Sequence, residues 1–184
     1  MIKGKADYKE YLKLDKIALH RNRKKPRFND IVWKYEILLR KCEYYKNCKK
    51  GLLNLLILKY YKYRKYKIEL KTNFAIPLNS CGKGLSIAHI GPIIINSKAK
   101  LGDFCRIHVG VNIGTNSGTT DEVPQLGNYI YIGPGAKIFG NIKIADNIAS
   151  GANAVVNKDF LESGITIAGI PAKKISNKGA KALL

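Results

Sequence analysis

The chain has 184 residues and carries 33 Lys and Arg against 13 Asp and Glu, a formal net charge of +20 at pH 7. This length allows one domain with an appended region or two small domains, each with a core of ordinary size. Because the sequence has no apolar run of the roughly 20 residues that cross a bilayer and no apolar core after its basic N-terminus, we expect neither a membrane span nor a signal peptide. Four cysteines without a metal-binding spacing fit a reducing compartment, so we expect a cytoplasmic protein without a bound metal.

Residues 1–71 differ in charge from the rest, with 22 Lys and Arg against 7 Asp and Glu. Apolar residues recur at helical spacing over Tyr8–Leu19 and Ile31–Leu70, which predicts helices there. The basic segment Arg21–Arg27 reads as a connector, and Gly51 is expected to divide the second helical stretch in two. We therefore predict a short basic α-helical region over residues 1–71.

Three interpretations of this basic region stay open. Lys and Arg interleaved with Tyr can bind nucleic acid, but no recognised motif is present, and we expect no nucleic-acid partner. A basic amphipathic helix can also rest on an anionic membrane, which would put the protein at the inner face of the membrane. The plainest interpretation is a solvated basic surface that also attracts a polyanionic small ligand.

An aliphatic residue then returns every six positions, often with a small residue just after it. The leading positions are Ile95, Leu101, Ile107, Ile113, Leu126, Ile132, Ile138, Ile144 and Val156. A period of six matches neither an α-helix nor a long strand, and an ordinary sandwich would give strands 8–12 residues apart with drifting register. The pattern predicts a mainly β domain over residues 72–175, a left-handed parallel β-helix of hexapeptide repeats, followed by a flexible tail over residues 176–184.

Two positions break the repeat. Counting back in sixes from Ile95 places His89 where an aliphatic residue belongs. The interval from Ile113 to Leu126 is thirteen residues where twelve would keep register, and the polar segment Asn116–Pro124 is expected to leave the column as a loop. A local rule broken inside a consistent repeat is where function is expected.

Five stretches carry a resemblance to a known family: GLSIAH (84–89), IHVGVNIGT (107–115), IGPGAKIFGNIKI (132–144), SGANAVVNK (150–158) and AGIPAKKI (168–175). In their order and spacing, over roughly residues 77–175, they resemble serine acetyltransferase and its relatives among the hexapeptide-repeat acyltransferases. The resemblance implies a homotrimer with acetyl-CoA in the grooves between neighbouring β-helices, and no metal.

His89 matches the catalytic histidine of that family. Moving an acetyl group from a thioester to a hydroxyl needs a base for the hydroxyl proton, and a histidine, with a pKa near 6.5 in water, can serve at cellular pH. His108 points outward and either lines the acceptor cleft or is a plain surface residue. The resemblance also implies a set of acetyl-CoA contacts: Gly114, Thr115, Pro134, Ala152, Pro171, Lys173 and Lys174. Of these, Lys173 and Lys174 are expected to meet the phosphates of acetyl-CoA as point charges.

The chain departs from the family where the acceptor is recognised. Phe74 and Ala88 replace the two aspartates that precede the catalytic histidine, so Asn79, Asp103, a backbone carbonyl or a neighbour's Asp121 or Glu122 would have to orient it. The family's Asp-Arg-His-Pro loop reads Asp121–Glu122–Val123–Pro124 here, which puts a carboxylate where the carboxylate of serine needs a cation.

The layout looks most like the O-acetyltransferases of capsular or exopolysaccharide synthesis, and the resemblance then implies a sugar hydroxyl as acceptor. The alternatives are a serine O-acetyltransferase of cysteine biosynthesis and a non-catalytic β-helix scaffold.

Overall fold

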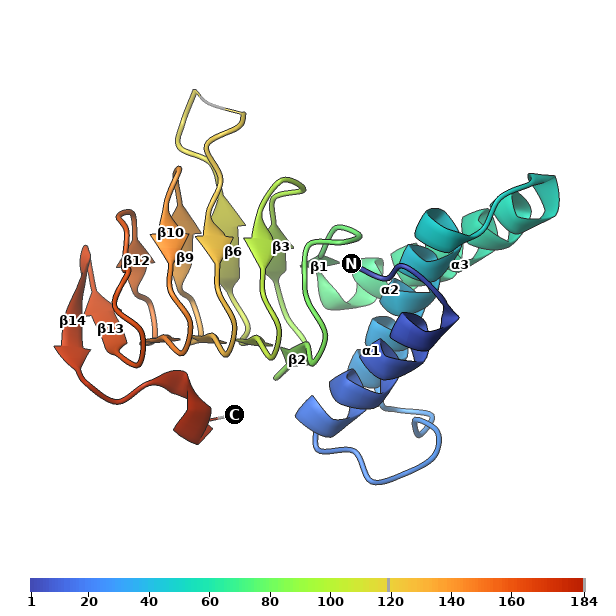
Figure 1. Cartoon of the computed structure of the whole chain (residues 1–184), viewed down its shortest axis with the longest axis horizontal. Helices are drawn as coiled ribbons and strands as arrows, with labels where there is room; N and C mark the ends of the chain where they lie inside the picture. The colour runs from blue at the N-terminus through green and yellow to red at the C-terminus, as the bar shows by residue number, and fades with distance from the viewer. Residues whose placement is uncertain (119, 184) are drawn as a thin grey trace.

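The computed structural model describes residues 1–118 and 120–183, with three helices at one end of a column of short strands (Figure 1). The helices are α1 (Lys5–Ala18), α2 (Ile31–Cys48) and α3 (Leu52–Thr72). As predicted, a break at Gly51, whose φ is +91°, separates the second and third helices. The helices end at Thr72 and the first strand begins at Phe74, so the helical region meets the strand region without a linker.

The strands form three sheets whose members come from successive coils of the chain. One sheet contains β1 (Phe74–Ala75), β3 (Ile93–Ile95), β6 (Val111–Gly114), β9 (Lys137–Phe139) and β12 (Val155–Val156). A second contains β4 (Lys100–Leu101), β7 (Gln125–Leu126) and β10 (Lys143–Ile144). The third contains β2 (Ser86–Ile87), β5 (Arg106–Ile107), β8 (Tyr131–Ile132), β11 (Ala149–Ser150), β13 (Thr166–Gly169) and β14 (Ala172–Ser176). All pairs are parallel except β13 with β14, which is the pattern of a β-helix with three faces.

Three corners join the three faces, and they are used below to locate residues. The first corner leads from the β2 sheet to the β3 sheet and contains residues 88–92, 108–110, 133–136 and 151–154. The hairpin turn at residues 170–171 joins β13 to β14 within the β2 sheet and continues this edge at the last coil. The second corner leads from the β3 sheet to the β4 sheet and contains the described residues 96–99, 115–118, 120–124, 140–142 and 157–159. The third corner completes the coil through residues 82–85, 102–105, 127–130 and 145–148.

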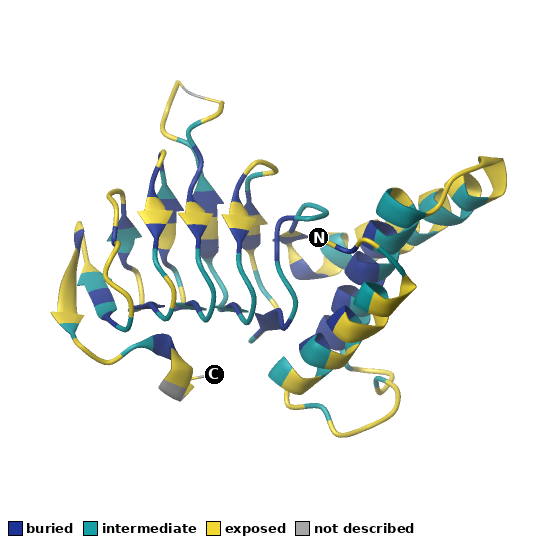
Figure 2. Ribbon diagram, in the orientation of Figure 1, coloured by how far each residue is buried: buried dark blue, intermediate teal, exposed yellow. Residues whose placement is uncertain are grey.

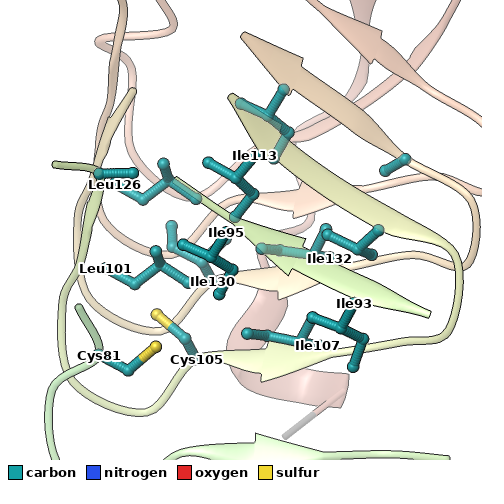
Figure 3. Packing of buried hydrophobic residues seen from close by; sticks show 14 of the residues in the cluster. Cys81, Ile93, Ile95, Leu101, Cys105, Ile107, Ile113, Leu126, Ile130 and Ile132 are labelled. Carbon is teal, nitrogen blue, oxygen red and sulfur yellow. The ribbon is translucent and has the colours of Figure 1, made fainter. Parts of the chain in front are cut away.

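The predicted inward residues form the core of the column. Ile107 pairs with Ile132 on the next coil, and Ile113 pairs with Ile138, so identical side chains stack along the axis (Figure 3). These residues are at most 1% exposed. Cys81 and Cys105 also point into the column as buried thiols (Figure 3). Burial raises the pKa of Cys81 to about 11, so its sulfur is a neutral, small apolar group.

The predicted register is wrong before Ile95. Ile87, not His89, pairs with Ile107 and takes the inward position, twenty positions before it along the chain. The later pair Ile95 and Ile113 is eighteen positions apart. Two extra residues therefore widen the turn after β2, and His89 lies exposed in that turn instead of in the apolar column, where its ring nitrogens would lack partners.

The second break is larger than the one extra residue that the sequence spacing indicated. Ile113 pairs with Ile138, twenty-five positions on, so seven residues are inserted into a coil of eighteen. They project from the second corner as the predicted loop (Figure 1). Val123 and Pro124 are buried at its base, and Thr119 lies outside the described residues.

Side-chain amide and carboxylate oxygens bridge successive coils at the third corner. Asp103 Oδ1 accepts from the backbone N–H of Lys83 (3.0 Å), and Asn128 Oδ1 accepts from that of Asp103 (2.8 Å). The residue before Asp103 is Gly102, which lies in close contact with the backbone of the next coil. A Cβ on Gly102 would lie 2.6 Å from the carbonyl oxygen of Gly127, well inside contact distance.

Gly102→Ala is expected to lower the free energy of unfolding by about 1–3 kcal/mol, because the added methyl meets backbone that cannot move independently. Urea unfolding followed by circular dichroism measures this. The matched control is Gly4→Ala, because a Cβ there meets no heavy atom within 4 Å. Equal stability of the two variants would contradict the close packing of the third corner.

The helical region covers the open end of the β-helix with charged side chains. Three buried carboxylates accept hydrogen bonds from backbone N–H groups of the first coil: Glu43 from Asn79 (2.8 Å), Asp15 from Leu85 (2.9 Å) and Glu36 from Ile87 (3.0 Å). Arg40 donates to the carbonyl oxygens of Cys81 (3.0 Å) and Gly82 (2.5 Å). These groups replace the coil that would otherwise pair with this exposed edge.

The tail was predicted to be flexible, but residues 180–183 form a turn of 3-10 helix that packs on the column. Ala180 is buried, and Asn147 accepts from the backbone N–H of Lys181 (2.9 Å). The reason is that the side chain and carbonyl of Asn147 offer acceptors at the third corner to a passing backbone. The flexibility of the tail stays a prediction, and the structure adds the contact that this part of it makes.

Candidate functional site

Several of the predicted site residues lie along the first corner, one coil after another. His89 follows β2, His108 follows β5, Pro134 follows β8, Ala152 follows β11, and Pro171 lies between β13 and β14. Neighbouring strands are about 4.8 Å apart, so the four steps from β2 to β13 span about 19 Å. The first corner of the β-helix therefore runs from His89, the candidate base, to the end where Lys173 and Lys174 are the candidate phosphate contacts.

His89 stands at the edge of an open hollow of about 770 Å³ between the first coil and the helical region. Its ring centroid is 5.8 Å from that of His108, and the His108 ring is 4.9 Å from Tyr131. The three rings come from successive coils, β2, β5 and β8, of one sheet. His89 is exposed at the end of this row, where an acceptor can reach it.

His108 is the less accessible of the two histidines. Its Nε2 atom is buried and has no hydrogen-bond partner among the described residues. Burial lowers the pKa of His108, and the charges of Arg106 and His89 lower it further. The neutral form of His108 is therefore favoured beside His89, which suits a site where His89 itself handles the proton.

The other wall of the hollow is the connector between α1 and α2. His20, Arg21, Arg23 and Arg27 line it. The sequence marked the connector as basic but indicated no role for His20. No pattern relates the segment near residue 20 to residue 89, because only the packing of helices on the first coil brings the two together.

One carboxylate, Asp30, appears among the described residues that line the hollow. It caps α2 by accepting from the N–H of Trp33 (3.3 Å) and forms an ion pair with Arg21 (2.8 Å). Two of the residues proposed to orient His89 are engaged away from it: Asn79 bonds with Asn47, and Asp103 bonds with Lys83. Their predicted role is not supported.

The predicted acceptor residues Asp121 and Glu122 lie on a different corner. They belong to the loop between β6 and β7, whereas His89 follows β2, and the two segments lie on opposite sides of the column (Figure 1). Asp121 forms an ion pair with Lys98, and Glu122 accepts from Asn116 (3.2 Å). Within one chain they do not line the hollow at His89, because the coil turns through a whole sheet between the two corners.

The predicted acetyl-CoA residues divide in the same way. Gly114 ends β6 and Thr115 follows it, so both belong to the second corner with the loop. Pro134 and Ala152 are exposed on the first corner, where small side chains leave backbone groups open to an extended chain.

The two lysines predicted to contact acetyl-CoA differ in their surroundings. Lys173 is exposed in β14, while Lys174 forms an ion pair with Glu162 (2.5 Å). Among the described residues, no group of three His, Cys, Asp or Glu side chains could hold a metal ion.

The chain is similar in sequence to known proteins over about half of its length. No family model matches the chain. It is 38% identical over 101 residues to the serine acetyltransferase of Synechococcus elongatus, and this match covers 54% of this chain and 41% of that protein. It is 40% identical over 96 residues to the serine acetyltransferase of Helicobacter pylori J99, covering 52% and 56%. The chain spans about half the length of the curated relatives it matches.

Solved structures extend the likeness over nearly the whole chain. The Brucella abortus serine acetyltransferase in complex with coenzyme A has a TM-score of 0.70 and 25% identity, and covers 95% of this chain and 70% of that one. This is the serine acetyltransferase fold. The predicted left-handed β-helix with a helical region in front is thereby confirmed. Soybean serine acetyltransferase with bound serine, at 19% identity and a TM-score of 0.70, supports the fold alone.

Proposed function

We propose that the chain is an acetyl-CoA-dependent O-acetyltransferase that acts as a homotrimer, with His89 as general base. The observation that carries the proposal is the exposed His89 at the head of a corner whose later coils present small residues and an exposed Lys173. The coenzyme A complex of the Brucella protein, which has this fold, supports acetyl-CoA as the donor.

In the proposed reaction, His89 takes the proton from the acceptor hydroxyl as its oxygen bonds to the acetyl carbon. The carbon–sulfur bond of the thioester then breaks, and His89 returns the proton to the leaving sulfur. Neutral His108 keeps a second positive charge away from His89, because its pKa is lowered by burial. Lys173 would meet phosphate as a point charge at the far end of the corner.

A trimer would complete this site. Gly114, Thr115, Asp121 and Glu122 lie on the second corner, which one chain cannot bring to its own first corner. In a three-fold assembly of prisms, the second corner of one copy can face the first corner of the next. The groove between copies would then hold acetyl-CoA, and the loop of one copy would reach the hollow of its neighbour.

Two acceptors enter the proposal, each on a different observation. L-Serine is supported by the similar proteins, which are named serine acetyltransferases. A sugar hydroxyl of a capsular or exopolysaccharide precursor is supported by the loop, where Lys98 already pairs with Asp121 and Glu122 offers a further carboxylate. The sugar is our first candidate, because serine recognition needs a cation where Glu122 stands.

We expect kcat/KM for L-serine to be at least tenfold below that of the best sugar acceptor. The carboxylate of serine and that of Glu122 are like charges, which repel by roughly 4 kcal/mol at about 4 Å and an effective dielectric near 20. A third of this energy already lowers the affinity for serine about tenfold. The measurement is release of the coenzyme A thiol at fixed acetyl-CoA, with L-serine beside neutral and acidic sugars.

Glu122→Arg is the matched variant for this experiment. It should raise kcat/KM for L-serine at least tenfold and leave a neutral sugar within about twofold. A serine value of roughly 10⁴ M⁻¹s⁻¹ or above with every sugar inactive would establish a serine acetyltransferase instead. No thiol release with any acceptor, together with no binding of coenzyme A, would favour a non-catalytic scaffold.

A further inference from the structure

α3 carries an exposed apolar stripe along its whole length. Six large side chains recur at steps of four, four, three, three and four, which average the 3.6 residues of a helical turn. They are Leu52, Leu56, Tyr60, Tyr63, Tyr66 and Leu70, each between 52% and 75% exposed. We call this set the α3 stripe. Figure 2 shows α3 as largely exposed, in contrast to the buried faces of α2.

Basic residues flank the stripe, and the helix has no acid on the same face. The exposed cations are Lys59, Lys62, Arg64, Lys67 and Lys71. Arg64 and Lys67 lie over the rings of Tyr60 and Tyr63, at 5.8 and 5.7 Å. Within α3, all of which the structure describes, Glu69 is the one carboxylate, and it turns inward to Lys65 (2.5 Å) and Tyr35 (3.0 Å).

The stripe continues onto the free end of the helix. Leu53 and Leu55 are also exposed beside Leu52, just after the turn at Gly51. This end of α3 lies farthest from the β-helix, whereas Thr72 at the other end adjoins β1 (Figure 1). No helix in residues 1–118 and 120–183 is long and apolar enough to cross a bilayer. The leucines can therefore enter only the outer part of one.

The apolar and basic side chains of α3 indicate which kind of partner can bind the α3 stripe. A second copy of α3 laid on the first would bring two rows of Lys and Arg together without carboxylates between them, which is repulsive. A nucleic acid would match the cations but leave four leucines at the tip without a partner. A lipid surface with anionic headgroups accepts both, since leucines enter the acyl boundary, tyrosines sit at the headgroups and cations meet phosphate.

We propose that α3 lies in the plane of an anionic lipid bilayer, with the α3 stripe toward the acyl chains. This assignment rests on the stripe and its charges and is independent of the proposed acetyl transfer.

The test is vesicle co-sedimentation of the full chain. Binding to vesicles with one third anionic phosphatidylglycerol should be at least tenfold stronger than to phosphatidylcholine alone. It should also weaken as salt shortens the screening length from about 30 Å at 0.01 M to about 8 Å at 0.15 M. Leu56→Glu combined with Tyr63→Glu should lower the affinity at least tenfold.

Leu161→Glu is the matched control, because Leu161 is 69% exposed on the β-helix, away from the α3 stripe. It should bind vesicles within twofold of the unchanged chain. Equal binding to both vesicle types, or an unchanged affinity of the α3 variant with its helical circular dichroism intact, would overturn the proposal. So would loss of a larger assembly in the α3 variant without loss of vesicle binding, which would assign the stripe to a second copy.

Discussion

Replacing His89 by alanine is expected to lower kcat for acetyl transfer by about 10²–10⁴-fold, the usual contribution of a positioned general base. The reason is that the imidazole takes the acceptor proton only as the new carbon–oxygen bond forms. The affinity for acetyl-CoA should stay within about threefold, because the proposed cofactor contacts lie on later coils than His89, from Gly114 to Lys174. Steady-state kinetics with calorimetric titration of coenzyme A separates these two effects.

His20→Ala is the control for this substitution. His20 lines the same hollow but belongs to the connector, so its loss should change kcat less than tenfold. If His89→Ala retains activity within a few-fold of the unchanged chain, the base lies elsewhere. If both variants lose activity and coenzyme A binding together, the hollow has a structural role and the assignment of His89 fails.

The sequence predicted the column because its signal is local and repeated. Ile107, Ile113, Ile132 and Ile138 are each specified by a period of six, and a stack of coils needs only that period. The register before Ile95 was wrong because a widened turn does not change composition. Counting in sixes cannot detect two added residues such as those near His89, whereas pairing of Ile87 with Ile107 shows them directly.

The hollow was beyond prediction for a different reason. It is formed by the connector around His20 and by the turn at His89, and no residue pattern encodes a contact between them. His89 itself was identified through the likeness of its motif, GLSIAH, to a family. The positions of Asp121 and Glu122 on the second corner follow from the sheet topology. The period of six predicts a β-helix, but it does not show which repeat belongs to which of the three faces.

The sequence of α2 contains a signal for the buried charges that contact the first coil. Glu36, Arg40 and Glu43 are spaced four and three apart, so they share one face of α2, and that face also carries the buried Val32 and Leu39. Charges on the apolar face of an amphipathic helix are rare unless they are paired. Such a pattern indicates a buried polar contact, although not its partner, which is here the backbone edge at Cys81 and Gly82.

Arg40→Ala is expected to lower the free energy of unfolding by about 3–5 kcal/mol, the range for breaking a buried ion pair from one side. Arg40 is fully buried, with ion pairs to Asp15 (2.7 Å) and Glu43 (2.9 Å). Without it both carboxylates stay buried without a cation, and two carbonyl oxygens of the first coil lose their donor. Urea unfolding at fixed protein concentration measures the loss, and Arg21→Ala is the control. The side chains of Arg21 and Asp30 are 40% and 14% exposed, so the free energy of unfolding of Arg21→Ala should fall by less than about 1 kcal/mol.

The deficit of Arg40→Ala should also depend on pH in a direction that identifies its cause. Burial already raises the pKa of Asp15, and Arg40 opposes that rise. Removing Arg40 should raise this pKa further, so the folded variant binds a proton more tightly than the unfolded chain does. A carboxyl with a raised folded pKa stabilises the fold below its unfolded pKa and loses that contribution as pH rises through the folded value. The deficit should therefore be smaller near pH 5 than near pH 8. A deficit that does not change with pH, or one no larger than that of Arg21→Ala, would mean that packing rather than the buried charges holds the helical region on the first coil.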